Sequence, residues 1–185
     1  MTWDVCEAYL REHCNAWAYP IPETTIAYAK NLWGFCERVQ AKSILEVGIG
    51  PTSVSGCTFL HWLTPLGLQL VSVDVDASRP QEKYRTLAKT LNVPWHVHHG
   101  DSMDVADCLW DSVDLLYIDG DHSFTYAYGD TVAYVPRLKS GGLLVIDDTN
   151  TEGVRQARVE LEREGYVFEY HPHEESNGHL VWQKP

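Results

Sequence analysis

The sequence predicts an α/β fold, a Rossmann-like, doubly wound and mostly parallel seven-stranded sheet with an antiparallel hairpin at its C-terminal end. From residue 43 onward, short apolar segments rich in β-forming residues alternate with segments of helical periodicity, which is typical of a parallel sheet with helices on both faces. The last two strand-like segments, 166–170 and 179–182, have no helix between them and are expected to pair as a hairpin. A length of 185 residues fits one domain.

Residues 1–42 precede the first strand and are expected to form two helices that belong to the same domain. Apolar spacing predicts a first helix over 3–14 and a second from a cap at Thr24 or Thr25 to about residue 40. Plain packing against the sheet is the simplest role for them, and a lid or an oligomer contact is the functional alternative. Their aromatic residues make a homodimer plausible. The inward face of the second helix would contain Ile26, Ala29, Leu32, Trp33 and Cys36.

The alternating part of the chain follows in order. Parallel strands are predicted at 43–47, 68–73, 95–99, 113–118 and 143–146. Helices are predicted at 52–63, 78–91, 102–109, 124–138 and 151–164. Pro51 suits the first turn of a helix, and the sequence Lys139-Ser140-Gly141-Gly142 predicts a turn into the fifth strand.

The composition argues against several kinds of partner. The formal net charge is -12, and nucleic acid is not expected because phosphate backbones are bound by clustered Lys and Arg. No apolar run approaches the length of a membrane span, and the N-terminus has no apolar signal-peptide core, so no membrane partner is expected. Five scattered cysteines without a Cys-x-x-Cys pair are typical of reduced thiols, which predicts a cytoplasmic protein.

Carboxylates follow two of the predicted strands. The fourth strand runs into Asp119-Gly120-Asp121-His122, and the fifth runs into Asp147-Asp148. Open α/β sheets bind ligands at this carboxyl edge, and neighbouring strands lie about 4.8 Å apart. If the fourth and fifth strands are neighbours, Asp119 can share a cation with Asp147 or Asp148, and oxygen ligands favour Mg²⁺, Mn²⁺ or Ca²⁺ over zinc.

Two residues beside these acids are candidate bases. In locally extended chain Asp119 and Asp121 point the same way. Asp121 is the first choice to take a proton from a substrate hydroxyl, and His122 is the second. Structural alternatives exist for most of the group, because Asp121 suits a turn, His122 can pack beside the next helix, and Asp147-Asp148 can cap a helix. Asp119, which ends a buried strand before a glycine, is the hardest to explain structurally.

The first strand closes in a glycine turn, Glu46-Val47-Gly48-Ile49-Gly50, where a ligand can lie against backbone N–H groups. Ser53 stands where the dinucleotide fingerprint needs a third glycine, so a nicotinamide dinucleotide is the weaker interpretation. Asp74 ends the second strand, where a carboxylate can accept both hydroxyls of a ribose. The segment Gly100-Asp101-Ser102 follows the third strand, where an adenine edge would lie.

In combination these motifs resemble the class I S-adenosylmethionine-dependent methyltransferases over roughly residues 43–150. The resemblance rests on the glycine turn, on Val73-Asp74, on Gly100-Asp101-Ser102 and on the segment 118–123. More narrowly, Asp-Gly-Asp-His-Ser followed by Leu-Lys-x-Gly-Gly and Asp-Asp is similar to the metal-dependent small-molecule O-methyltransferases of the macrocin and aminocoumarin-sugar type. Residues 43–185 are then expected to form the cofactor-binding methyltransferase domain.

The resemblance implies a role for each site residue. Glu46, Gly48 and Gly50 would hold the methionine part of S-adenosylmethionine, Asp74 the ribose, and Asp101 with Ser102 the adenine. The resemblance implies Asp119, Asp147 and Asp148 as metal ligands, with Mg²⁺ the first choice of metal. Asp119 would also contact the cofactor.

The expected function is methyl transfer from S-adenosylmethionine to a hydroxyl of a small molecule, assisted by a divalent metal. The alternatives are a metal-independent methyltransferase, including one that acts on nitrogen, and a non-catalytic cofactor-binding subunit.

Overall fold

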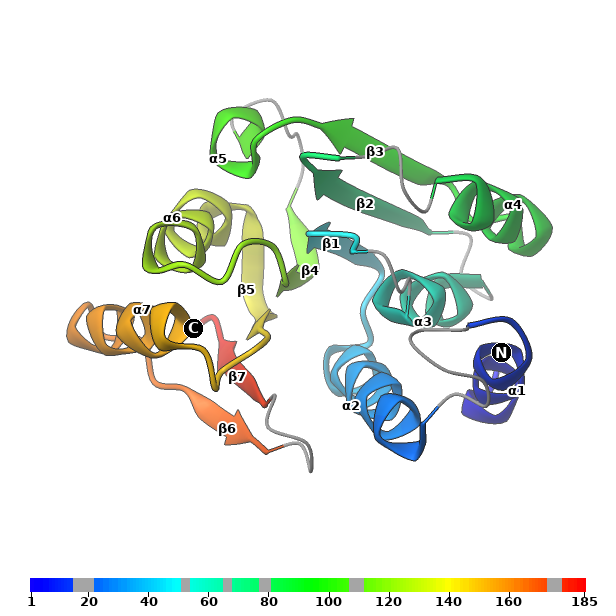
Figure 1. The fold of residues 1–185 in the computed structure, drawn as a ribbon, viewed down its shortest axis with the longest axis horizontal. Helices are drawn as coiled ribbons and strands as arrows, with labels where there is room; N and C mark the ends of the chain where they lie inside the picture. The colour runs from blue at the N-terminus through cyan, green and yellow to red at the C-terminus, as the bar shows by residue number, and fades with distance from the viewer. Residues whose placement is uncertain (15–21, 51–53, 65–67, 77–80, 107–111, 173–177) are drawn as a thin grey trace.

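The computed structural model contains one seven-stranded sheet (Figure 1). It describes residues 1–14, 22–50, 54–64, 68–76, 81–106, 112–172 and 178–185. The strands are β1 (Ser43–Val47), β2 (Gln69–Asp74), β3 (Trp95–His99), β4 (Val113–Ile118), β5 (Leu138–Ile146), β6 (Glu169–His171) and β7 (His179–Gln183).

The strands lie in the order β3-β2-β1-β4-β5-β7-β6. The first five are parallel to their neighbours, whereas β7 runs antiparallel to both β5 and β6. The predicted fold class is therefore confirmed, including the C-terminal hairpin. Strands β1, β3 and β4 begin and end at the predicted residues, because turn-forming or polar residues bound each apolar segment.

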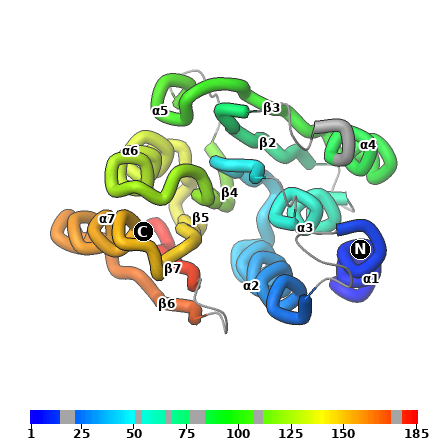
Figure 2. Tube along the Cα trace, in the orientation of Figure 1, coloured from blue at the N-terminus to red at the C-terminus, as the bar shows by residue number. Residues whose placement is uncertain are grey.

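Helices cover both faces of the sheet (Figure 2). On one side lie α1 (Trp3–His13), α2 (Glu23–Val39), α3 (Val54–Leu63) and α4 (Gln81–Leu91). On the other side lie α5 (Ser102–Val105), α6 (Phe124–Tyr134) and α7 (Glu152–Arg163). Three predicted features lie outside the described residues: Pro51, the start of helix 78–91 and the end of helix 102–109.

Alternate residues of the central strands feed two separate apolar layers. Leu115 and Tyr117 of β4 pack with α1, α2 and α3, whereas Leu116 and Ile118 pack with α6 and α7. This period of two follows from the strand geometry, which turns successive side chains to opposite faces. The segment before β1 therefore shares a core with the sheet, and all five residues predicted on the inward face of α2 are buried.

The predicted start of the second helix is wrong. Neither Thr24 nor Thr25 caps α2, because Pro22 occupies the cap position and its carbonyl accepts from the N–H groups of Thr25 and Ile26. A proline has no N–H to satisfy and its fixed φ suits the entry to a helix. The helix consequently begins one residue earlier than the first predicted cap.

The predicted helix over 124–138 is too long, and the predicted turn over 139–142 is wrong. Helix α6 ends at Tyr134 and a short 3₁₀ turn, η3 (Val135–Arg137), follows, because Pro136 cannot continue the helical hydrogen bonding. Strand β5 then begins at Leu138 with a bulge against β4. Gly141 and Gly142 exchange hydrogen bonds with Lys184, which draws the expected turn into the sheet.

The described cysteines are buried and form no disulfide with one another: Cys6, Cys14, Cys36 and Cys57. Cys108 lies outside the described residues. Among the described helices, none combines the length and the apolar character needed to cross a membrane.

Candidate functional site

The carboxyl ends of β1, β4 and β5 meet at one edge of the sheet. Backbone hydrogen bonds continue past the strand ends, from Asp119 N to Val47 O at 2.8 Å and from Asp147 N to Ile118 O at 3.0 Å. The chain winds outward through β2 and β3 and then returns to β4 on the far side of β1, so the strand order reverses between β1 and β4. Open α/β sheets bind ligands at such a reversal point.

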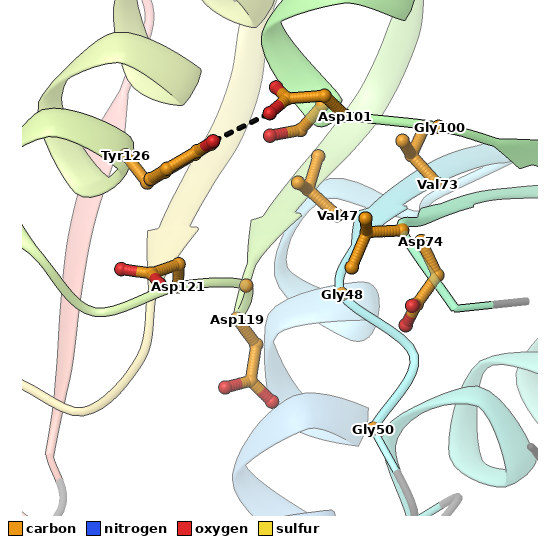
Figure 3. Close-up of a pocket in the computed structure, with 13 residues that line it drawn as sticks. Val47, Gly48, Gly50, Val73, Asp74, Gly100, Asp101, Asp119, Asp121 and Tyr126 are labelled. Carbon is orange, nitrogen blue, oxygen red and sulfur yellow. Dashed lines mark hydrogen bonds between the residues drawn. The ribbon is translucent and has the colours of Figure 1, made fainter.

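A cavity of about 360 Å³ opens at this edge (Figure 3). This volume is in the usual range for small-molecule sites. The residues that line the cavity include every predicted cofactor-binding residue except Glu46, together with the predicted base Asp121: Gly48, Gly50, Asp74, Asp101, Ser102 and Asp119. Tyr126 of α6 also lines it.

The two glycines of the turn have different roles. Gly48 has φ +89°, and a Cβ atom there would lie 2.1 Å from the carbonyl oxygen of Asp119. Gly50 has φ +62° but has open space where its Cβ would be. Only at Gly48 does the missing side chain let the first strand's turn lie directly against the fourth strand's end.

Asp74 joins the glycine turn to the end of β2. Its Oδ2 accepts from the N–H of Ile49 at 2.8 Å, and its Oδ1 accepts from the N–H of Asp76 at 2.7 Å. Each carboxylate oxygen has a second lone pair. Asp74 can therefore hold the turn and still accept a ligand hydroxyl.

Glu46 is fully buried behind the turn. Its Oε1 accepts from the hydroxyl of Ser55 at 2.6 Å and its Oε2 from the hydroxyl of Ser72 at 2.7 Å. Burial raises the pKa of Glu46 to about 8, although the two hydroxyls act in the opposite direction. The side chain thus joins α3 to β2, and the structure does not place it in the cavity where a methionine contact was predicted.

Because Glu46 is buried, we expect the free energy of unfolding to depend on pH, and we expect Glu46→Gln to remove this dependence. An unfolded glutamate ionises near pH 4.3, whereas folded Glu46 keeps its proton up to about pH 8. Because the folded state then binds the extra proton, stability falls as the pH rises through this window, by at most about 1.4 kcal/mol per pH unit. In urea unfolding between pH 5 and 8, the free energy of unfolding of Glu46→Gln should rise relative to that of the wild type as the pH increases. Parallel curves would contradict this, and the exposed Glu12→Gln is the control.

A second group of side chains lies beside the cavity. Asp119, His122 and Asp148 each have an atom that could bind a metal ion, and these three atoms all lie within 4.8 Å of one another. The Nε2 atom of His122 is 3.0 Å from Asp148 Oδ2 and 3.4 Å from Asp119 Oδ1. We call these three residues the acidic cluster. Among the described residues it is the only such group of potential metal ligands.

The cluster contains two of the three predicted metal ligands, Asp119 and Asp148. Its third member is His122, and the predicted ligand Asp147 is not part of it. Asp147 is buried, and its Oδ2 accepts from the hydroxyl of Tyr117 at 2.7 Å. Its Oδ1 accepts from the backbone N–H of Asp148 at 2.7 Å. Asp147 therefore holds the backbone of Asp148 and the hydroxyl of Tyr117, both of which are next to the cluster.

The neighbouring ionisable groups shift the pKa values of two residues in the cluster. Partial burial, together with the carboxylates of Asp147 and Asp148, raises the pKa of Asp119 to about 7. Hydrogen bonds to Asp119 and Asp148 raise the pKa of His122 to about 10. At neutral pH the imidazolium of His122 thus balances part of the negative charge.

This charge state bears on the two predicted bases. A protonated His122 has no lone pair with which to accept a proton. Asp121 lies outside the cluster, and its Oδ1 accepts from the backbone N–H of Ser123 at 2.8 Å. Hydrogen bonds from the side chain and the backbone of Ser123 lower the pKa of Asp121. The expectation that Asp119 and Asp121 point the same way is wrong, because the chain turns after Gly120 and the two carboxylates diverge (Figure 3).

Two tyrosines support the cluster in a way that the sequence motifs do not indicate. The hydroxyl of Tyr117 contacts Asp147 and also lies 3.1 Å from Asp119 Oδ2. The hydroxyl of Tyr28, from α2, hydrogen-bonds to that of Tyr117. Tyr117 could have been found from its position, because it lies two residues before Asp119 on the same face of β4. Tyr28 carries no such signal.

A family model described as a methyltransferase domain matches residues 45–149, which is more than half of the chain. The chain belongs to this family. The resemblance to class I S-adenosylmethionine-dependent methyltransferases is thereby confirmed, and the protein is an enzyme of that class. A search of curated proteins found no match.

Solved structures of methyltransferases share the fold at low sequence identity. A putative caffeoyl-CoA O-methyltransferase from Staphylococcus aureus has a TM-score of 0.73 and 15% identity, over 96% of this chain and 91% of that one. TomG, an O-methyltransferase from Streptomyces achromogenes solved with S-adenosylmethionine, has a TM-score of 0.68 and 16% identity, over 99% and 89%. An O-methyltransferase from Bacillus cereus, solved with S-adenosylhomocysteine, has a TM-score of 0.66 and 14% identity, over 99% and 100%.

Proposed function

We propose that this methyltransferase moves the methyl group of S-adenosylmethionine to a hydroxyl oxygen of a small molecule, with a divalent cation at the acidic cluster. The observation that carries the proposal is the position of Asp119, which lines the cavity and also belongs to the cluster. A donor held in the cavity and an acceptor held at the cluster would therefore meet at this carboxylate. O-Methyltransferases among the structural neighbours favour the same chemistry.

The cavity fits a sulfonium nucleoside. Gly48 and Gly50 expose backbone at one side, Asp74 offers carboxylate oxygens to a ribose, and Asp101 with Ser102 occupies the far end. The carboxylate of Asp119 supplies negative charge near the turn, which suits a ligand with a positive centre.

The cluster fits a divalent cation by its spacing and its charge. Ligand atoms around a cation lie roughly 2.0–2.6 Å from it, so donors within 4.8 Å of one another can share one. Asp119, His122 and Asp148 would hold it. Two carboxylates and an imidazole make a mixed oxygen and nitrogen set, which suits Mn²⁺ as well as the Mg²⁺ expected from oxygen ligands alone. Binding would displace the proton of His122.

A divalent cation lowers the pKa of a hydroxyl by stabilising its anion. The chain contributes the rest of the mechanism by positioning. The turn at Gly48 fixes the end of β1 against Asp119, so that an acceptor oxygen near Asp119 approaches the cofactor from one side. Holding two reactants in this way is worth on the order of 7–11 kcal/mol at best. The acceptor hydroxyl would give its proton to the carboxylate of Asp121, which lines the cavity, and its oxygen would take the methyl group as the methyl–sulfur bond breaks, which leaves S-adenosylhomocysteine.

The paired His122 supports a second candidate, a methyltransferase that uses no metal. In the structure the imidazolium already neutralises Asp119 and Asp148, as a cation would. Such an enzyme would suit an acceptor that needs little activation, for example an amine nitrogen. The raised pKa of His122 argues against that residue as its base at neutral pH.

A thermal shift assay separates these candidates. S-Adenosylhomocysteine at 100 times its dissociation constant should stabilise the protein by about 2.7 kcal/mol. Mn²⁺ or Mg²⁺ should add a second, EDTA-reversible shift, and NAD⁺ is the control ligand. No response to S-adenosylhomocysteine would remove both methyltransferase candidates. A nucleoside response without a metal response, together with activity in EDTA, would establish the metal-free enzyme.

A further inference from the structure

A buried carboxylate lies beneath the far end of the cavity and outside the machinery described so far. Asp130 of α6 has 1% of its surface exposed. Its Oδ1 accepts from the hydroxyl of Ser102 at 2.6 Å. Its Oδ2 has no hydrogen-bond partner among the described residues and is buried. A charged oxygen without a partner is expensive to bury, so its retention needs a reason.

The bond to Asp130 decides what Ser102 can offer to a ligand. A serine hydroxyl has one proton and two lone pairs. Burial raises the pKa of Asp130 to about 6, so at pH 8 its carboxylate is ionised and can only accept. The proton of Ser102 is then committed to Asp130, and the cavity side of the hydroxyl oxygen can only accept as well.

Asp101 has the same character. Its Oδ1 accepts from the backbone N–H of Met103 at 3.0 Å, and its Oδ2 accepts from the hydroxyl of Tyr126 at 2.5 Å (Figure 3). The proton of Tyr126 is thereby used, and the carboxylate has none to give. The polar side chains at this end of the cavity therefore present only acceptors to a ligand.

We propose that Asp130 is a positioning residue that fixes Ser102 as a hydrogen-bond acceptor, and that this selects a 6-amino purine over a 6-oxo purine in the nucleoside of the methyl donor. The inference rests on the proposed use of the cavity for that nucleoside. A 6-amino group donates two protons to such a surface. A 6-oxo group brings another acceptor against it and leaves both sides unpaired.

The test compares S-adenosylhomocysteine with S-inosylhomocysteine, its 6-oxo analogue, by isothermal titration calorimetry at pH 8. The wild type should bind the adenine compound about 10-fold or more tightly, which is the effect of one well-placed hydrogen bond. Asp130→Ala frees the proton of Ser102 to turn into the cavity and should reduce the preference to about 3-fold or less. Asp130→Asn keeps a carbonyl oxygen for Ser102 and should restore the preference.

Two more variants keep the result interpretable. Asp104→Asn removes an exposed carboxylate from the same short helix and should leave the preference unchanged, which excludes a general effect of charge. Ser102→Ala should weaken the preference to about the level of Asp130→Ala without any change at Asp130, because Asp101 keeps its acceptor oxygens, and it decides the matter if Asp130→Ala does not fold.

Some outcomes would overturn the inference. They are an unchanged preference in Asp130→Ala or Ser102→Ala, a loss in Asp130→Asn as large as in Asp130→Ala, or a wild type that does not discriminate. If the wild type binds neither compound, the proposed donor site itself is wrong. If it binds the adenine compound and the variants keep the wild-type preference, only the role of Asp130 is wrong.

Discussion

Gly48→Ala is expected to abolish binding of S-adenosylhomocysteine and to destabilise the fold by several kcal/mol. The new Cβ would lie 2.1 Å from the carbonyl oxygen of Asp119 and 2.8 Å from the Cα of Gly120. Both obstacles are backbone, so the turn or the end of β4 must move. Left-handed strain adds about 1–3 kcal/mol and overpacking a similar amount. Calorimetric titration and urea unfolding measure the two effects.

Gly50→Ala is the matched control for this experiment. Gly50 also has a positive φ, at +62°, but a Cβ there would meet nothing within 4 Å. It should therefore show only the conformational penalty, of about 1 kcal/mol, and keep most of its affinity. Equal effects of the two substitutions would mean that backbone strain alone, and not contact with the end of β4, makes Gly48 necessary.

Asp119→Asn is expected to lower kcat/KM for methyl transfer by about 10³-fold or more. The substitution keeps the shape of the side chain and removes the one charge shared by the cavity and the acidic cluster. A loss of this size corresponds to about 4 kcal/mol of transition-state stabilisation. Binding of Mn²⁺, followed by calorimetry or electron paramagnetic resonance, should weaken in parallel.

Two further variants separate the parts of this prediction. Asp148→Asn should weaken Mn²⁺ binding similarly but leave the affinity for S-adenosylhomocysteine unchanged, because Asp148 is in the cluster and is not among the cavity-lining residues. Asp121→Asn, at a side chain that lines the cavity but lies outside the cluster, should leave Mn²⁺ binding unchanged. Full activity of Asp119→Asn would contradict the proposed function.

The sheet edge could be predicted from sequence because it depends on local patterns. Apolar segments that end in glycine or aspartate place Gly48, Asp74 and Asp119 at strand ends, and parallel pairing then brings strand ends together. That reasoning needs only the strand order and the period of two.

The internal arrangement of the edge depends on which way each side chain turns, and the sequence carries little information about that. Glu46 has the spacing of a ligand-binding acid, yet two serine hydroxyls hold it inside the fold. Asp147 and Asp148 are adjacent in sequence but face different partners, since Asp148 has φ +52° and the backbone turns between them. Such directions are set by tertiary contacts, which periodicity does not encode.

The hydroxyl contact between Tyr28 and Tyr117 extends the hydrogen-bond network behind the acidic cluster beyond the recognisable motifs. Tyr28 lies in α2, ahead of the segment that the family model matches. Its hydroxyl hydrogen-bonds to the hydroxyl of Tyr117, which in turn donates to the carboxylate of Asp147 at the end of β5. A variant that lacks α2 would therefore lose a hydrogen-bond partner of Tyr117, although every motif residue of the site is kept.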